Sequence, residues 1–407
     1  MAVVSARPLG GLRIVECASF VAGPSCGMAL GQLGADVIRV DPIGGGADYH
    51  RWPIAANGSS LYWAALNKGK RSAAVDLRTE RGRELLMALV TAPGPEAGVF
   101  VDNSVGRRWL SYPALAARRA DLIHVRVQGH TDGRPAVDYT VNAEVGVPLI
   151  TGSEETAAPV NQVVPAWDLV TGMTAATGVL AALHERTATG RGAYLELALA
   201  DVALAGVANL GWLAEAELRG AERPRHGNHL YGSFGVDFRT HDGERIMVVA
   251  LTAGQWQALR TVTGTGEVLT ALEQATGADF SRETDRYQMR EAIAAILRPW
   301  FAAREFSEVR NRLDAARVLW ARYRGMVEVV AAHRAGCGES VLTSVDQPGI
   351  GPTIAARSPL RWAGCYLEAF PAPALGQHTE EVLAEVLGLG QAEIGALYDD
   401  GVVAGPC

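Results

Sequence analysis

The feature that most constrains the fold is an alternation of strand-like and helix-like segments over the first half of the chain. Residues 12–16 and 35–40 are rich in branched apolar residues, which is typical of strands. Between them, residues 26–33 predict a short helix ended by Gly34, and residues 23–25 (Gly-Pro-Ser) predict a break before it. This order predicts a βαβ unit with parallel strands.

The alternation continues to about residue 199. It predicts strands at 72–76, 98–102, 122–127 and 194–198, and helices at 79–89, capped by Thr79, and at 167–186. The fold class is therefore α/β, with a large Rossmann-like domain built on a parallel sheet.

The pattern changes after residue 200. Residues 201–219 predict a long helical stretch ended by Gly220, and residues 223–235 predict a loop. A hairpin with an Asp242-Gly243 turn follows, then helices at 253–262, 291–303 and 307–316, and a last helix near 379–387. The part after the loop is predicted to be a smaller α+β domain.

Composition restricts the classes of partner. Lys and Arg number 37 and Asp and Glu 44, a net charge of −7 without a basic block, so we expect neither nucleic acid nor a membrane surface as partner. The five cysteines include no C-x-x-C pair and the histidines no H-x-x-x-H, so we expect no metal site and a reducing, cytoplasmic compartment. Residues 1–10 lack the apolar stretch of a secretory signal, and residues 171–183 are too short to span a bilayer.

Several polar residues are candidates for chemistry, each with a plainer alternative. Asp168 starts a predicted helix, where it is either a cap or a carboxylate nucleophile. Asp138 is interpreted as a turn or cap residue. The basic cluster at 67–71 is either a solvated turn or a phosphate site, and His226 and His229 lie in a glycine-rich loop. No G-x-G-x-x-G fingerprint follows the first strand, so the glycines after this strand are interpreted as turn residues and not as an NAD site.

The order of short motifs resembles the class III CoA-transferase family, which includes formyl-CoA transferase and α-methylacyl-CoA racemase. The matching stretches are 9–15, Ala22-Gly-Pro24, 33–40, 67–72 with Asp76-Leu77, 180–186, Thr189-Gly-Arg-Gly192, Asp242-Gly243 and 375–380. A narrower likeness to one branch of the family covers 41–46, 138–142, 164–172, 227–235, 347–351 and 401–406.

The resemblance implies that Asp168 is the catalytic aspartate and that CoA, as part of the substrate, is the only cofactor. It implies CoA contacts at Phe20, Val21 and Ala22 near the reacting end, at Val75 and Arg78 near the adenine, and at Asn103 and Arg107 near the pantetheine or phosphates. Arg107 and its neighbour Arg108 are hard to tell apart. Asn228, Tyr231 and Gly232 are expected in a substrate loop, with backbone N–H groups of 227–235 as oxyanion donors.

The branch likeness implies that CoA moves between two carboxyl groups of one dicarboxylic acid through an aspartyl-CoA thioester. The alternative is transfer between two separate acids. A racemase is disfavoured, because that branch has a His where this chain has Val137.

The family also implies an interlocked homodimer. On this basis the chain divides into a large CoA-binding domain (1–200), a helical linker (201–225), a small domain (226–330) and a C-terminal return to the large domain (331–407).

Overall fold

A computed structural model describes residues 7–104, 106–336 and 338–406. It contains two compact units: unit 1 comprises Met1–Val145, Gln162–Glu215 and Gly338–Cys407, and unit 2 comprises Gly146–Asn161 and Ala216–Cys337. The domain boundaries given above remain a prediction. Residues 1–6 of the N-terminal segment 1–10, Cys337 and Cys407 lie outside the described residues. Cys17, Cys26 and Cys365 are free thiols.

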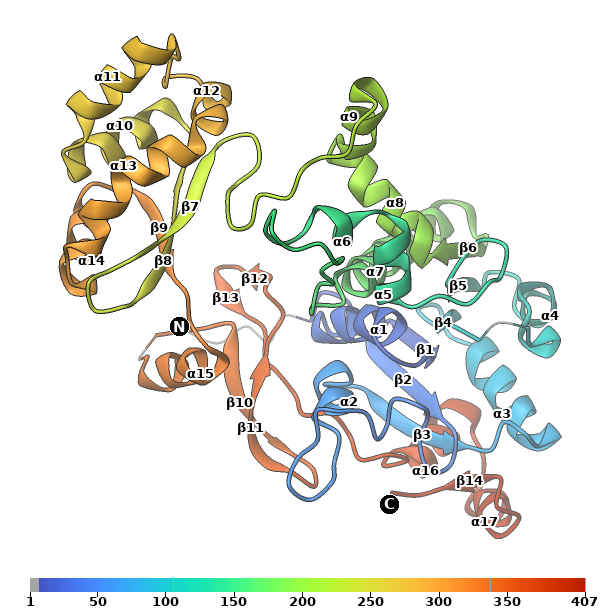
Figure 1. Ribbon diagram of the computed structural model, residues 1–407. Coiled ribbons are helices and arrows are strands. Elements are labelled where there is room, and N and C mark those ends of the chain that lie inside the picture. Colours follow the sequence, from blue (N-terminus) through green and yellow to red (C-terminus); the bar gives the residue numbers. More distant parts are fainter. Residues whose placement is uncertain (1–6, 105, 337, 407) are drawn as a thin grey trace. The chain divides into compact units, whose positions relative to one another are not determined.

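Unit 1 is built on a seven-stranded sheet with the order β14-β3-β2-β1-β4-β5-β6 (Figure 1). Its strands are β1 (Arg13–Cys17), β2 (Asp36–Asp41), β3 (Arg71–Val75), β4 (Val99–Asp102), β5 (Ile123–Gln128), β6 (Ala193–Ala198) and β14 (Val403–Ala404). All neighbours are parallel except β14, which pairs antiparallel with β3. The parallel sheet predicted from the sequence is confirmed, with the strand order of a doubly wound nucleotide-binding fold.

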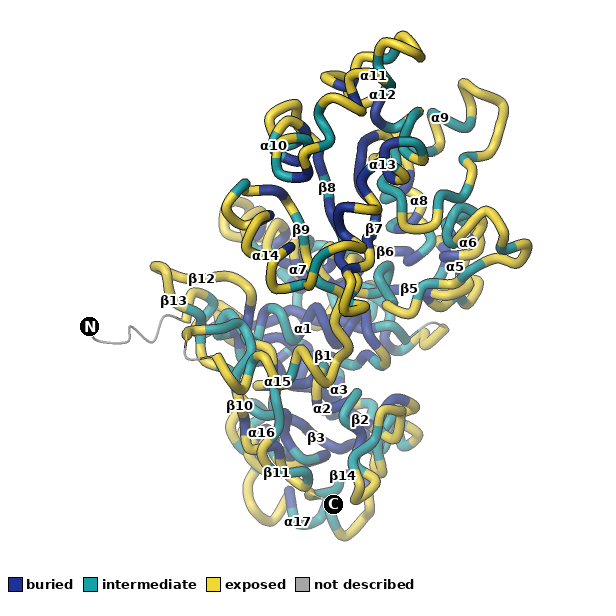
Figure 2. Tube along the Cα trace, turned by 60° about the vertical axis from the view of Figure 1, so that its left-hand side comes forward, coloured by how far each residue is buried: buried dark blue, intermediate teal, exposed yellow. Residues whose placement is uncertain are grey.

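Both faces of this sheet are covered, and successive residues of one strand point to opposite faces. Ile14 belongs to the apolar cluster formed with α1 (Ala22–Gln32) and α7 (Ala166–Thr189). Its neighbour Val15 belongs to the cluster formed with α3 (Glu80–Thr91), α4 (Tyr112–Ala116), α16 (Thr379–Leu387) and α17 (Gln391–Asp399). Figure 2 shows the sheet strands as largely buried tube.

The remaining elements of unit 1 are short or peripheral. They are α2 (Leu61–Leu66), η1 (Arg108–Leu110), α5 (Asp138–Glu144), α8 (Leu199–Asn209) and the hairpins β10 (Leu342–Gln347) with β11 (Gly351–Ala356) and β12 (Arg361–Trp362) with β13 (Cys365–Tyr366). Helix α9 (Trp212–Arg219) runs across the boundary to unit 2.

Unit 2 packs helices against a three-stranded antiparallel sheet, β7-β8-β9. Its elements are α6 (Val147–Ile150), β7 (Phe234–Arg239), β8 (Arg245–Ala250), α10 (Ala253–Thr263), α11 (Gly266–Thr276), α12 (Glu283–Gln288), α13 (Arg290–Ala302), α14 (Phe306–Ala315), β9 (Leu319–Arg322) and α15 (Met326–Ala335). The predicted hairpin is confirmed, with Gly243 in the left-handed region at its turn.

The structure differs from two local predictions. Residues 23–25 do not break the chain but form the first turn of α1, where Pro24 is tolerated because the amide it lacks would have no helical partner. Residues 201–219 form two helices, α8 and α9, bent by 66° at a break that contains Gly211, whose φ is 76°.

Helix α7 is longer than predicted. Among the described residues, it is the one unbroken helix whose length and composition would allow it to cross a membrane. It packs tightly on α1. A Cβ atom added to Gly172 of α7 would lie 1.9 Å from the Ser25 Oγ of α1 and 2.8 Å from the carbonyl oxygen of Ala22. Only glycine permits this approach.

Candidate active site

Asp168 lies in the first turn of α7, on a segment that a second helix fixes. The backbone N–H of Asp168 donates to the Asp138 carboxylate at 3.0 Å, and the Trp167 indole N–H donates to the Asn142 amide oxygen at 2.9 Å. Asp138 and Asn142 both belong to α5 and are buried. The first turn of α7 is therefore anchored to α5 by two side chains.

Asp138 was interpreted from the sequence as a turn or cap residue, and its position is more specific than that. It starts α5, but its carboxylate satisfies an amide at the start of α7, 30 residues away. Such an amide has no partner within its own helix, so a carboxylate there is stabilising. Asp138 is thus a support for the Asp168 backbone.

The charge of Asp168 is disfavoured in this position. Burial and the nearby Asp138 carboxylate raise the pKa of Asp168 to about 6, and the Arg51 guanidinium opposes the rise. The pKa of Tyr62 is raised to about 12, first by burial and then, against Arg51, by the charges of Asp168 and Asp48. The Arg51 guanidinium lies over the rings of Phe20 and Tyr62, at 5.6 and 5.4 Å from their centroids.

The loop after β1 lies where the strand order of the sheet reverses, between β1 and β4. Open α/β sheets bind ligands at this point, outside the carboxyl ends of the strands. Ser19 of the β1 loop donates its N–H to the Asn103 side-chain oxygen at 3.2 Å, and the Asn103 amide donates back to the Ser19 carbonyl at 3.0 Å. The two loops at the reversal point are joined by these bonds.

The CoA residues expected from the resemblance follow three strands of the parallel sheet, β1, β3 and β4. Phe20, Val21 and Ala22 follow β1, Val75 and Arg78 lie at the end of β3, and Asn103 and Arg107 follow β4. Val75 is fully buried, backbone included, and the exposed Arg78 pairs with Asp76 at 2.8 Å.

Arg107 lies near the end of β1, since its charge acts on the thiol of Cys17. This interaction supports Arg107 as a residue at the reversal point.

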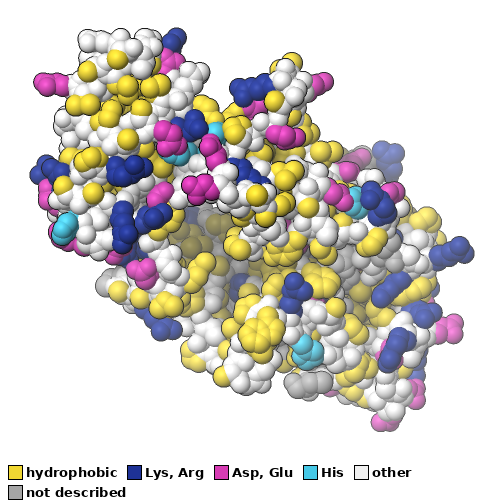
Figure 3. Space-filling model, in the orientation of Figure 1, with side chains coloured by type: hydrophobic (Ala, Val, Ile, Leu, Met, Phe, Trp, Pro, Cys, Tyr) yellow, Lys and Arg dark blue, Asp and Glu magenta, His cyan; other side chains and the backbone are white. Residues whose placement is uncertain are grey.

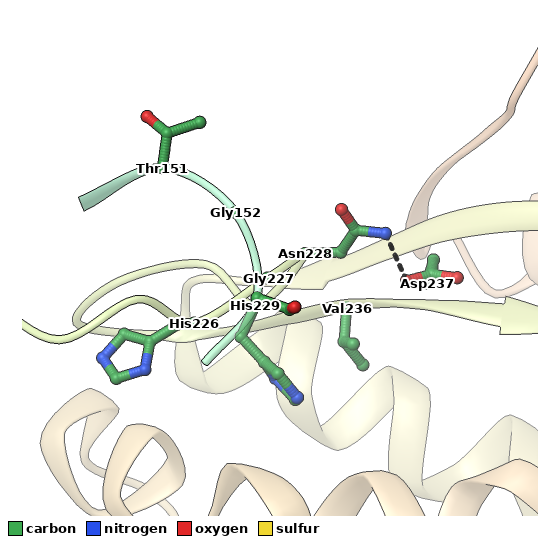
Figure 4. A pocket seen from close by; sticks show the side chains of 9 residues that line it. Thr151, Gly152, His226, Gly227, Asn228, His229, Val236 and Asp237 are labelled. Atoms are coloured by element: carbon green, nitrogen blue, oxygen red, sulfur yellow. Dashed lines mark hydrogen bonds between the residues drawn. The ribbon is translucent and has the colours of Figure 1, made fainter. Parts of the chain in front are cut away.

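Asn228, Tyr231 and Gly232 all lie in unit 2, in the loop before β7. A pocket of about 540 Å³ in unit 2 is lined by Thr151, Gly152, Ser153, His226, Gly227, Asn228, His229, Val236 and Asp237 (Figure 4). Within it the Asn228 amide donates to the Asp237 carboxylate at 2.8 Å. Tyr231 stacks on His226, with the Arg223 guanidinium 3.6 Å from its ring centroid.

Sequence reasoning missed three residues near Asp168 and Phe20. Arg51, Tyr62 and Asp48 come from the segment between β2 and β3, for which no local pattern predicted a role. The available signal was the glycine run at 44–46 followed by Asp48 and Arg51, which marks a tight loop carrying charges. The basic cluster at 67–71 is neither a solvated turn nor an open phosphate site, because Asn67, Lys68 and Lys70 are buried.

No group of three or more His, Cys, Asp or Glu side chains that could hold a metal ion occurs within residues 7–104, 106–336 and 338–406. The chemistry available around Asp168 is that of a carboxylate, an opposing guanidinium and a phenol. A carboxylate of raised basicity suits nucleophilic attack on an acyl group.

Comparisons with known proteins agree with this arrangement. The profile of CoA-transferase family III matches residues 9–379. The chain is 51% identical over 401 residues to 2-methylfumaryl-CoA isomerase of Chloroflexus aurantiacus, covering 98% of each chain. It is 29% identical to succinyl-CoA:mesaconate CoA-transferase of Haloarcula hispanica, covering 94% of this chain and 97% of the relative. Among solved structures, a CAIB/BAIF family protein from Brucella suis superposes with a TM-score of 0.76 at 28% identity, covering 93% and 99% of the two chains.

Proposed function

Because the chain belongs to CoA-transferase family III, we propose that it is an intramolecular CoA transferase that converts 2-methylfumaryl-CoA into 3-methylfumaryl-CoA. The observation that carries this proposal is the 51% identity to a relative named 2-methylfumaryl-CoA isomerase, which extends over 98% of both chains. Substrate and product are the C1 and C4 thioesters of one dicarboxylic acid, mesaconate.

The proposed reaction begins with Asp168. Its carboxylate attacks the C1 thioester carbonyl, which gives a mixed anhydride and releases the CoA thiolate. The thiolate attacks the aspartyl carbonyl, which gives an aspartyl-CoA thioester and frees mesaconate. The C4 carboxylate attacks this thioester and again releases the thiolate, which then attacks the C4 carbonyl and regenerates Asp168.

The environment of Asp168 supports this role. With a pKa of about 6 the group is ionised at neutral pH and more basic than an ordinary carboxylate. Both substrate groups that Asp168 exchanges with are carboxylates, so the two mixed anhydrides are close in energy. A hydroxyl nucleophile would form an ester too stable to return the acyl group.

We assign the remaining site residues by family position and by their place in the fold. CoA lies across the carboxyl ends of β1, β3 and β4, on Phe20, Val21, Ala22, Val75, Arg78, Asn103 and Arg107. Asn228, Tyr231 and Gly232 belong to the substrate loop. Arg51, which is exposed and whose charge acts on Asp168, is suited to hold the free carboxylate of the substrate.

An exposed apolar surface on unit 1 supports the interlocked homodimer. Leu169, Val170, Met173 and Leu180 of α7 are 39 to 46% exposed, and hydrophobic side chains gather over α1, α5 and α7 in Figure 3. A surface of this kind on a long helix is costly in water, and a second copy of the chain would cover it. We assign the protein to the cytoplasm, which the free thiols of Cys17, Cys26 and Cys365 support.

The second candidate function is CoA transfer between two separate acids, which the relative named succinyl-CoA:mesaconate CoA-transferase favours. A racemase is disfavoured by Val137, because the residue before Asp138 carries no imidazole to move a proton.

One experiment separates the two transferases. The enzyme is incubated with 2-methylfumaryl-CoA alone, and the two regioisomers are resolved by chromatography. Isotope-labelled free mesaconate is then added in excess. We expect isomerisation without any added acid and little label in the product, because the bound acid is the closer nucleophile. Rapid entry of label would replace the isomerase with the intermolecular transferase.

Asp168→Ala and hydroxylamine test the covalent step. The variant should fold and lose turnover, and hydroxylamine should modify Asp168 only in the presence of substrate. Wild-type activity in the variant would exclude the aspartyl thioester.

A further inference from the structure

We propose that Asp48, itself held by Arg39, is a positioning residue that fixes the loop 18–21 in its CoA-binding conformation before CoA arrives. The inference rests on the proposed function, because that loop is the proposed contact with CoA near the reacting thioester. It adds a role for a buried network of charges that the chemical steps do not use.

Phe20 adopts a conformation that needs external support. Its φ is 69°, in the left-handed region that bulky residues rarely occupy. Such backbone persists only where surrounding contacts hold it, and these positions gather at ligand sites. Phe20 is 39% exposed, so core packing of its own side chain does not supply the support.

Hydrogen bonds to the backbone supply it instead. The Phe20 N–H donates to the Asp48 Oδ2 at 2.9 Å. The preceding residue, Ser19, is held on both its N–H and its carbonyl by Asn103. Two consecutive residues of the loop are thus fixed from two sides, by Asp48 on one and Asn103 on the other.

Asp48 cannot easily turn away from this bond. It is 1% exposed, and both of its oxygens accept from the Arg39 guanidinium, at 3.1 and 3.3 Å. Arg39 is equally buried and is bound at the same time by Asp41 at 2.8 Å and by the Asn67 amide oxygen at 2.9 Å. Because its donors are bound in this way, the Arg39 guanidinium has one orientation. That orientation in turn fixes the Asp48 carboxylate.

The network continues to a second buried cation. Lys70 Nζ lies 2.8 Å from both Glu16 oxygens and also donates to Asn67 at 2.9 Å. Glu16 reaches Arg39 at 3.5 Å but makes no bond to the loop 18–21. Glu16 therefore shares the network with Asp48 while lacking its contact with Phe20, which makes it a matched control.

The glycine run before Asp48 fits this arrangement. A Cβ added to Gly46 would lie 3.2 Å from Asp48 Oδ1 and 3.4 Å from Ser19 Oγ, so a side chain there would press on the bonded loop. Gly44 and Gly45 both have positive φ and turn the chain back toward it. The backbone conformation of residues 44–48 thus places the Asp48 carboxylate against the loop 18–21.

A loop already fixed in the free enzyme loses little conformational freedom when CoA binds. The contribution is to binding of the CoA moiety, which is shared by all steps of the reaction. Loss of the Asp48 bond should therefore raise KM and leave kcat nearly unchanged.

The first test uses the wild-type protein without any ligand. Hydrogen exchange at the Phe20 amide, read by mass spectrometry of short peptides or by NMR, should be slower by about a hundredfold or more than in an unstructured peptide. Addition of CoA should change this rate little. Free exchange at Phe20 before CoA is added would overturn the proposal, whether or not any variant folds.

The second test compares three variants by calorimetric titration with free CoA and by steady-state kinetics. Asp48→Ala should weaken CoA binding and raise KM by about tenfold, with kcat within about twofold of wild type. Asp48→Asn keeps an acceptor for the Phe20 N–H and should restore most of the affinity. Glu16→Gln should lower the midpoint of urea unfolding but leave CoA affinity within about twofold.

The outcomes separate this inference from the proposed function. A folded Asp48→Ala protein that binds CoA like the wild type overturns the positioning role while the isomerase stands. A wild-type protein that binds CoA but does not isomerise 2-methylfumaryl-CoA overturns the substrate assignment, and the exchange and titration measurements still decide the role of Asp48. A wild-type protein that binds no CoA overturns both.

Discussion

Replacing the proposed nucleophile, Asp168, should make the protein more stable at pH 8. Asp168→Asn removes a charge that its surroundings disfavour and keeps a side chain of the same size. We expect the variant to lose turnover and to gain free energy of unfolding at pH 8. The reasoning depends on the direction and cause of the Asp168 pKa shift.

The magnitude follows from the site. The pKa of Asp168 is raised from 3.8 to about 6, first by burial and then by Asp138, against the opposing charge of Arg51. That difference corresponds to roughly 3 kcal/mol of cost to the charged folded state. The carboxylate also loses a favourable interaction with the start of α7, about 0.5–1 kcal/mol, when it becomes an amide. Allowing for its partial exposure, we expect a net gain of about 1–2 kcal/mol.

The sign of the pH dependence is fixed by the same shift. Because the folded-state pKa lies above the unfolded value, the folded protein binds the proton more tightly. The cost of the charge is therefore fully present above pH 6, falls as the pH drops through that value, and is absent below about pH 4. The advantage of Asp168→Asn should disappear over the same interval.

The assay is urea unfolding of wild type and variant at pH 8 and pH 4, at one protein concentration so that association does not enter the comparison. Asp201→Asn is the control, since Asp201 is an exposed carboxylate in the first turn of α8. It should lose a few tenths of a kcal/mol at pH 8. An Asp168→Asn protein that is less stable at pH 8, or equally favoured at pH 4, would refute the account of the site.

Three further outcomes are expected. The acid limb of the pH profile of kcat/KM should lie near pH 6, where Asp168 protonates. Asp138→Asn removes a neighbouring negative charge and should move this limb to lower pH. If the limb does not move, another group titrates there. Gly172→Ala should lower the free energy of unfolding in urea by about 1–3 kcal/mol, since its Cβ would lie 1.9 Å from an oxygen of α1. Gly395→Ala, with open space around it, should cause no loss, and equal effects of the two variants would contradict the packing of α7 on α1. Glu16→Ala should cost about 3–5 kcal/mol, because two buried cations lose a carboxylate, and a loss below about 1 kcal/mol would show that water replaces it.

Local pattern was enough to predict most elements of the sheet and its helices. The Thr79 side chain caps α3 as expected, accepting from the Gly82 N–H at 3.0 Å, because a cap depends on residues within one turn. Helix α16 spans the predicted residues, Thr379 to Leu387, and Gly388 follows it in the left-handed conformation. The failed break at 23–25 has a local cause too, since proline stops a helix only after its first turn.

The candidate site was predictable only in part, because its contacts join distant segments. Asp168 could be named from its resemblance to a family motif, but the partner of its amide, Asp138, is 30 residues away. The charge of Arg51 acts on Asp168, and the Asp48 carboxylate accepts from the Phe20 amide. The residues on either side of Arg51 and Asp48 show neither a helix or strand periodicity nor a helix-cap pattern. The glycine run at 44–46 marks the loop that carries these residues, but a single sequence does not show which distant residues they contact.

The packing of the late elements α16 and β14 on β3 has a consequence for how the protein is made. The amide of Ala74 in β3 is bonded to the Thr379 hydroxyl at 3.0 Å, across 305 residues. A ribosome needs roughly 15–60 s to translate that interval at about 5–20 residues per second. Throughout it, β3 is an open sheet edge on the nascent chain, with the apolar face that α16 and α17 later cover still exposed. We therefore expect the nascent chain to need protection by a chaperone, and the segment bearing Asp168 to leave the ribosome well before the sheet that supports it is closed.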